Sequence, residues 1–213
     1  MMRALVTLIA LLTTACGWAP DKLVVHASGP LAVGQTHRVT ASDHCPDGGL
    51  FKPHLIYWCF DDDVTLHGAR ALPEGHAEVL GVDPRARERP TIRVKVLRPG
   101  NFDLYASGTV GSSRLNDRQG FEAQRVERVS IRRAEPKAPL RVGRANEVTV
   151  YVQGAKRTLM PGDEPLLRGG PGKVRCDLAK GYRQTCYLTP DRRGRFVVTS
   201  PVLRGFEQAF EAR

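Results

Sequence analysis

The chain has 213 residues, of which 41% are hydrophobic and 25% are charged, and its formal net charge is +10. These fractions are typical of a globular protein and exclude a disordered chain, while the length allows one or two domains of ordinary size. With 21 glycines and 15 prolines, the chain is interrupted too often for long helices. The composition therefore favours an all-β protein.

The first 15 residues have the parts of an export signal. Arg3 supplies a positive charge, an apolar run extends from Ala4 to Leu12, and small residues follow it. This run of about nine residues is too short to cross a bilayer as a helix, which needs about 20 residues, but it suits the core of a signal peptide. We expect residues 1–15 to form a signal helix and the protein to be exported.

Residues 14–16, TAC, resemble the end of a bacterial lipoprotein signal, in which small residues precede a cysteine that is lipid-modified and becomes the first mature residue. Thr13 departs from the pattern, because the family usually has Leu there. The resemblance implies a lipid, such as palmitate, on Cys16, with residues 16–21 as the lipidated N-terminus and linker. It also implies the outer membrane, because Gly17 replaces the Asp that tends to hold such proteins in the inner membrane. The alternative is an ordinary secretory signal that leaves Cys16 free.

Cysteine counting supports this anchor. The chain has five cysteines, and removing Cys16 leaves an even set suited to disulfides in an oxidising compartment: Cys45, Cys59, Cys176 and Cys186. Of three possible connectivities, the local one pairs Cys45 with Cys59 and Cys176 with Cys186. Lys180 and Gly181 lie midway between the last two, which predicts a hairpin with these cysteines facing each other.

Three pairs of similar segments indicate an internal duplication. In the same order along each half, LAVGQTHRVT at Leu31 matches LRVGRANEVT at Leu140, GNFDLYAS at Gly100 matches GRFVVTS at Gly194, and GFEAQ at Gly120 matches GFEQA at Gly205. The first copy is about 15 residues longer between its first two matches. The extra residues fall in a stretch containing DDDVTLHGARALPEG and DPRARERP, which we expect to be loops.

Apolar and polar residues alternate in both copies, which predicts strands. Residues 91–97, TIRVKVL, alternate cleanly, and Phe102, Leu104 and Ala106 place apolar side chains on one face of the next strand. Residues 146–152 and 195–199 are similar. An antiparallel sandwich requires this pattern, because one sheet face meets the core and the other meets water.

The VGxxxxVT segments and the later G-x-F strands resemble immunoglobulin-like modules of bacterial envelope proteins. We therefore predict an all-β fold with two tandem immunoglobulin-like antiparallel β-sandwiches after the signal helix. The first covers residues 22–134 and the second, smaller and more basic, covers residues 139–213. The Pro-containing stretch AEPKAP, residues 134–139, is the predicted linker, short enough to place the modules end to end.

Two clusters in the first half contain metal-ligating residue types. The first has two imidazoles and two thiols that suit zinc, but it lacks the spacing of a zinc finger, and export favours a disulfide: His44, Cys45, His54 and Cys59. The second is the run Asp61, Asp62 and Asp63, whose repulsion a calcium ion would relieve, or which forms a solvated turn. We expect no metal and no cofactor.

The sequence has no G-x-S-x-G elbow, H-E-x-x-H pair, P-loop or dinucleotide-binding turn. We therefore expect no catalytic residues and a non-enzymatic protein. The alternative is a hydrolase or metal-dependent enzyme on loops of the first module, around His44, His54 and the Asp61 to Asp63 run.

Positive charge is unevenly distributed. Residues 22–135 have 16 Lys and Arg against 14 Asp and Glu, whereas residues 136–213 have 15 against 7. Guanidinium groups suit bidentate contacts with phosphate or carboxylate, which makes Arg192, Arg193 and Arg195 candidate anion-binding residues; the alternative is a solvated basic face.

Neighbouring aromatic residues, such as Tyr187, fall at strand spacing, so we do not expect nucleic acid. The predicted function is an envelope lipoprotein that binds or scaffolds an anionic envelope component, such as lipopolysaccharide phosphates, peptidoglycan carboxylates or an acidic protein.

Overall fold

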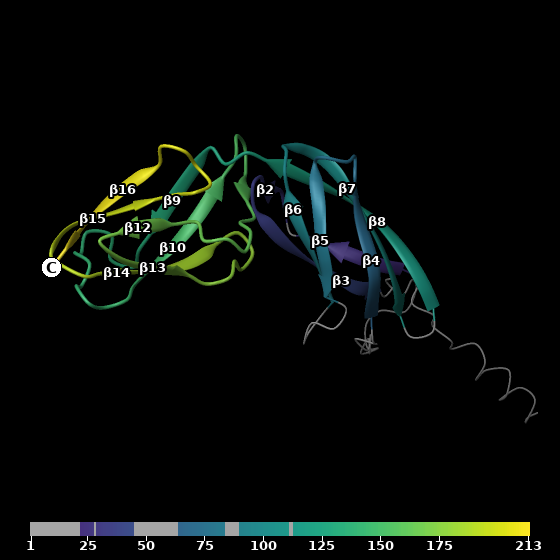
Figure 1. The fold of residues 1–213 in the computed structure, drawn as a ribbon, viewed down its shortest axis with the longest axis horizontal. Coiled ribbons are helices and arrows are strands. Elements are labelled where there is room, and N and C mark those ends of the chain that lie inside the picture. The colour runs from purple at the N-terminus through teal and green to yellow at the C-terminus, as the bar shows by residue number, and fades with distance from the viewer. Residues whose placement is uncertain (1–21, 28, 45–63, 84–89, 111–112) are drawn as a thin grey trace, which may run out of the picture.

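A computed structural model of the chain describes residues 22–27, 29–44, 64–83, 90–110 and 113–213. These residues form two immunoglobulin-like β-sandwiches that lie end to end (Figure 1). No helix among them is long and apolar enough to cross a membrane. The all-β fold with two tandem sandwiches is therefore confirmed, while the predicted signal peptide, residues 1–15, and residues 16–21 lie outside the described residues.

The first module packs two sheets face to face. One has the order β1 (Lys22–His26), β3 (Thr36–His44), β6 (Thr91–Val96) and β5 (Ala77–Asp83). The other has the order β2 (Leu31–Ala32), β8 (Ser113–Gln124), β7 (Gly100–Val110) and β4 (Val64–Leu72). The inward side chains form the core, among them Val39, Ile92, Val94, Phe102 and Leu104. The predicted alternation in residues 91–97 and at Phe102, Leu104 and Ala106 is confirmed by their burial.

The second module has the same layers. Its larger sheet contains β9 (Arg128–Arg132), β10 (Asn146–Gln153), β14 (Gln184–Pro190) and β13 (Gly172–Cys176) in that order, with β11 (Thr158–Leu159) also paired to β10. Its smaller sheet has the order β12 (Arg168–Gly170), β15 (Gly194–Thr199) and β16 (Glu207–Ala212). The core between the sheets includes Val148, Val150, Leu188, Phe196 and Val198.

Equivalent strand pairings confirm the duplication. Leu31 pairs in parallel with Ala123, and Leu140 pairs in parallel with Ala212. The third sequence match, however, is wrong by four residues: Phe102 faces Phe121 and Phe196 faces Phe210, so GFEA at residues 120–123 corresponds to AFEA at residues 209–212. Gly205 instead lies in the turn before β16 with a φ of 81°, a conformation that glycine adopts readily.

The predicted boundary at residues 134–139 is placed too late. β9 pairs with β10 as β1 pairs with β3, and Val126 and Val129 belong to the second core. Ala123 still belongs to the first core, so the modules meet between Ala123 and Val126. Residues 134–139 form a loop within the second module, where the Arg133 guanidinium donates to Ala138 O at 2.7 Å.

The interpretation of residues 64–72 as part of a loop is also wrong, because they form β4. The pairing of β4 with β7 shifts between Leu66 and Gly68 at a β-bulge. A bulge changes which residues face the core, so the simple alternation that marks a strand in sequence is lost. Residues 61–63 and 84–89 of the predicted loops lie outside the described residues.

Candidate functional site

The second module contacts the first through residues 160–164, which follow β11 and which we name the strap. The Met160 N–H donates to Pro30 O at 2.8 Å, and Met160 O accepts from the Ala32 N–H at 3.1 Å. Leu31 and Met160 thereby form a parallel bridge between modules. The strap extends the backbone hydrogen bonding of one module onto the other.

Side chains at the end of the strap, those of Asp163 and Glu164, bind it to the first module. The Glu164 carboxylate accepts from the Thr36 N–H at 2.7 Å, the Thr36 hydroxyl at 2.8 Å and the Lys95 ammonium at 2.8 Å. Asp163 donates its N–H to Thr36 O at 2.8 Å, and its carboxylate pairs with Arg38 at 2.8 Å. Burial alone would raise the pKa of Glu164, but the hydrogen bonds from Lys95 and Thr36 outweigh it and hold the pKa below its usual value.

Two fully buried glutamines, one from each module, complete the contact. Gln35 accepts from the Gly162 N–H at 2.7 Å and donates to Glu164 O at 3.4 Å. Gln184 accepts from the Leu166 N–H at 2.8 Å and donates to the same Glu164 O at 3.2 Å. Buried amides require such partners, and both of these glutamine side chains have them, whereas the buried Gln124 Oε1 next to Gly154 has no hydrogen-bond partner among the described residues.

Close packing at Gly162 depends on the missing side chain. A Cβ there would clash with Thr36 O and lie 2.7 Å from the Gln35 Cβ. The strap therefore sits directly on the β3 backbone. His37 supports the same region, because its buried ring, with Nε2 protonated, donates to Ala32 O at 2.9 Å. Burial lowers the pKa of His37, which favours the neutral ring.

The opposite end of the second module gathers three segments of the chain. Gly143 donates its N–H to Pro190 O at 2.8 Å, and Val142 donates to Arg213 O at 3.0 Å. Asn146 fixes the loop between them, because its amide donates to Arg144 O at 2.7 Å. The residues around these contacts include five exposed arginines, which we name the basic tip: Arg141, Arg144, Arg192, Arg193 and Arg213.

The three predicted anion-binding residues are all exposed, but they differ in their surroundings. Arg192 and Arg193 are exposed in the turn between β14 and β15 and belong to the basic tip. Arg195 lies on β15 and pairs with Glu207 at 3.1 Å. The sequence reasoning missed Arg141 and Arg144, although both stand in the repeated segment LRVGRANEVT, and it missed Arg213.

The predicted disulfide between Cys176 and Cys186 is present. The two residues face each other on β13 and β14 with their Cα atoms 4.0 Å apart, and the hairpin turns between Lys180 and Arg183 as expected. Other predicted residues lie outside the described residues: Cys16, Cys45, His54, Cys59, Asp61, Asp62 and Asp63. His44 ends β3, but its side chain is not described. The described part of the chain contains no cluster of three or more metal-ligating side chains.

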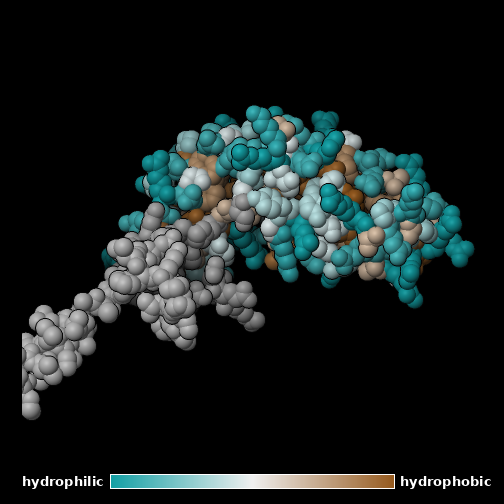
Figure 2. All heavy atoms as spheres, turned by 180° about the vertical axis from the view of Figure 1, so that it is seen from behind, coloured by the Kyte–Doolittle hydropathy of each residue, from teal (hydrophilic) through white to brown (hydrophobic). Residues whose placement is uncertain are grey.

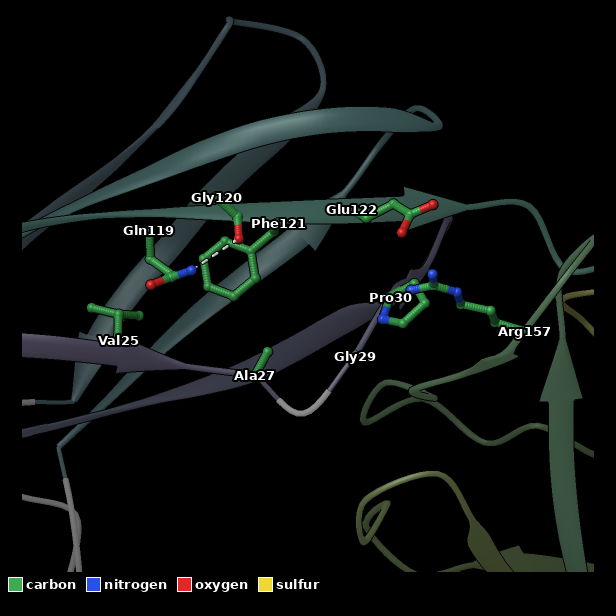
Figure 3. A pocket seen from close by; sticks show the side chains of 9 residues that line it. All are labelled: Val25, Ala27, Gly29, Pro30, Gln119, Gly120, Phe121, Glu122 and Arg157. Carbon is green, nitrogen blue, oxygen red and sulfur yellow. Dashed lines mark hydrogen bonds between the residues drawn. The ribbon is translucent and has the colours of Figure 1, made fainter.

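A cavity of about 300 Å³ lies where β1 and β8 approach the second module (Figure 3). Figure 3 shows Arg157 reaching from the second module towards Pro30, with Glu122 above it on β8, while the Phe121 ring lies farther along β8 next to Gln119 and Gly120. The described lining has no His, Cys, Ser or Thr side chain. It therefore offers no pairing of a nucleophile with a histidine base.

No protein-family model and no curated protein matches the chain. Among solved structures it is similar to domains 5–6 of the S-layer protein SbsC, with 13% identity and a TM-score of 0.35 over 90% of this chain and 96% of that one. It is also similar to the D00–D0 domain of intimin, with 10% identity and a TM-score of 0.30 over 90% of this chain and 99% of that one. Fibronectin(III)-like modules of CbhA from Clostridium thermocellum also align, with 7% identity and a TM-score of 0.31 over 89% of this chain and 92% of that one.

Proposed function

We propose that this protein is a membrane-anchored envelope lipoprotein that acts without catalysis, as a binding or scaffolding module for an anionic envelope component. The observation that carries the proposal is the concentration of positive charge on the second module. With the boundary placed by β9, residues 126–213 have 18 Lys and Arg against 9 Asp and Glu. Residues 22–125 have 13 against 12.

The anchor in this proposal is Cys16, whose sequence context resembles a lipoprotein signal. Lys22 begins β1, so about six residues separate the lipid from the first sandwich. A chain of that length reaches about 20 Å at most. The first strand of the first module therefore lies within this reach of the membrane, and we propose the outer membrane as its location.

The junction gives the second module a fixed position. The strap, the Glu164 contacts and the buried Gln35 join the modules by backbone and side-chain hydrogen bonds, and Gln184 holds the strap from within the second module. The basic tip lies at the end of the molecule farthest from the first module (Figure 1), and hydrophilic residues cover much of this end in Figure 2. A tethered, rigid arm of this kind suits scaffolding.

The test combines fractionation with capture from envelope extracts. The wild-type protein is expected in the membrane fraction and the Cys16→Ser variant in the soluble fraction. Immobilised Cys16→Ser protein is expected to retain an anionic component that high salt releases, because salt screens exposed charge contacts. Persistence of the variant in the membrane would refute the anchor, and retention of nothing salt-sensitive would refute the binding role.

A further inference from the structure

The basic tip is the structural counterpart of the end of the first module that holds the strap. Two backbone hydrogen bonds close each end, and their N···O distances are the same in both modules. The Gly34 N–H donates to Val96 O at 2.8 Å in the first module, as the Gly143 N–H does to Pro190 O in the second. The Val33 N–H donates to Gln124 O at 3.0 Å, as the Val142 N–H does to Arg213 O. The Asn146 amide donates to Arg141 O at 3.0 Å, as the His37 ring does to Ala32 O at 2.9 Å. The two copies therefore share one backbone framework here.

The side chains on this framework differ in charge. Arg144 stands where the first copy has Gln35, and Arg141 stands where it has Ala32. Gln35 and Ala32 are fully buried beneath the second module, whereas both arginines are exposed. Burying an unpaired guanidinium is costly. The tip is therefore unsuited to burial beneath a neutral surface and suited to a partner that supplies negative charge.

The tip arginines have no intramolecular counter-ions among the described residues. The ion pairs within 4.0 Å involve other cations, namely Arg38, Lys95, Arg118, Arg175 and Arg195. Asp191 is the one carboxylate side chain in the segments 141–145 and 190–194. The planar forks of the tip arginines can therefore make bidentate bonds to external phosphates.

The surroundings of the tip favour a broad anionic surface over a protein or a small ligand. The exposed large hydrophobic side chains of the described residues all lie elsewhere: Leu80, Leu97, Leu178 and Tyr182. Protein interfaces draw most of their binding energy from aromatic and apolar anchors, and small ligands require a concave site. The cavity in Figure 3 includes no tip residue. A lipid surface needs neither feature, because each basic residue adds to the attraction.

We propose that the basic tip docks onto a surface of anionic, phosphate-bearing lipids. This inference rests on the proposed function and names the partner class and the contact residues. Three segments of the chain present the tip arginines together, and they lie at the end of the molecule remote from the first module (Figure 1). The protein then connects its own anchoring membrane with an anionic lipid surface at its other end.

The experiment measures co-sedimentation of the full chain, as the Cys16→Ser variant without a lipid, with two kinds of vesicle. One contains phosphatidylcholine alone and the other contains phosphatidylglycerol as well. The tip variant carries Arg144→Gln, Arg192→Gln and Arg193→Gln. The control variant carries Arg168→Gln, Arg183→Gln and Arg204→Gln, which removes three exposed charges from the same module outside the tip. Thermal unfolding verifies that both variants fold.

The unlipidated protein is expected to bind only the anionic vesicles. The tip variant is expected to bind them at least about tenfold more weakly. The control variant is expected to lose much less of its binding to these vesicles than the tip variant does. Equal losses in the two variants would overturn the assignment to the tip. Salt-sensitive capture of an envelope polymer or acidic protein without vesicle binding would overturn the lipid partner but keep the proposed function, whereas absence of all anion binding would overturn both.

Discussion

Thr36 and Glu164 belong to different modules, are 128 residues apart in the sequence, and are joined by two hydrogen bonds. The Thr36 N–H donates to one oxygen of the Glu164 carboxylate at 2.7 Å, and the Thr36 hydroxyl donates to the other at 2.8 Å. Thr36 is 6% exposed, so water has little access to its backbone amide. This contact makes the junction a specific interface between modules.

Replacing Glu164 tests that contact. The Glu164→Ala variant leaves the buried Thr36 N–H without a partner, and an unsatisfied buried donor costs about 1–3 kcal/mol. We expect chemical denaturation to show a loss of that size in the free energy of unfolding. Glu207→Ala is the control, because it breaks an exposed pair with Arg195 that contributes about 0–1 kcal/mol. Equal effects of the two substitutions would argue against the junction.

Gly162→Ala tests the close approach of the strap. The added methyl group collides with the Thr36 carbonyl and the Gln35 side chain, and such overpacking costs about 1–3 kcal/mol. Gly81→Ala is a matched control, since a Cβ there has open space and Gly81 has no positive φ. Thermal unfolding should show a lower Tm for Gly162→Ala alone. A neutral Gly162→Ala would mean that the strap is not pressed against β3.

Removing the disulfide should weaken the second module. Replacement of both Cys176 and Cys186 by Ala removes a crosslink over a sequence separation of 10 residues, which stabilises by about 2–3 kcal/mol in the chain-entropy model. Denaturant unfolding under non-reducing conditions measures the change. A difference below about 0.5 kcal/mol would show that the hairpin gains nothing from the bond.

Acid should weaken the junction through two groups. Burial lowers the pKa of His37, so its contribution to stability is complete above the unfolded value of about 6.5 and is lost as pH falls through its lower folded pKa. The pKa of Glu164 is also lowered, so its contribution is complete above about pH 4.5 and is lost in stronger acid. We expect Tm to fall in both ranges.

His37→Asn separates the two steps, because Asn occupies the equivalent position in the second copy and makes the equivalent bond. Between pH 6.5 and the range in which Glu164 titrates, the Tm of this variant should fall less than that of the unsubstituted protein. In stronger acid, the Tm of both proteins should fall. An unchanged pH profile would exclude His37 as a contributor.

Local patterns predicted much of the fold. The alternation of TIRVKVL and of the strand containing Phe102 follows directly from one buried face, and the pairing of Cys176 with Cys186 follows from a short turn. β4 escaped detection because its bulge breaks the alternation. The third repeat was misaligned because GFEQA resembles GFEAQ in letters, while the strand pairing selects AFEA.

The junction could not be predicted, because its contacts join residues with no local pattern. Gln35 and Glu164 are single polar residues whose burial and partners depend on the docking of two modules. Likewise, Arg192 and Arg195 are both members of one short arginine-rich segment, but only Arg195 has an ion-pair partner among the described residues, Glu207 on β16. Long-range pairing decides these sites.

Rotational diffusion measured by 15N relaxation tests the central claim, that the two modules form one rigid arm carrying the basic tip. A body joined by the strap tumbles as a unit, so amides in β6 and in β14 should fit one elongated diffusion tensor. The Gly162→Ala variant should show shorter, separate correlation times for the two modules. Separate correlation times in the unsubstituted sandwiches would contradict the account.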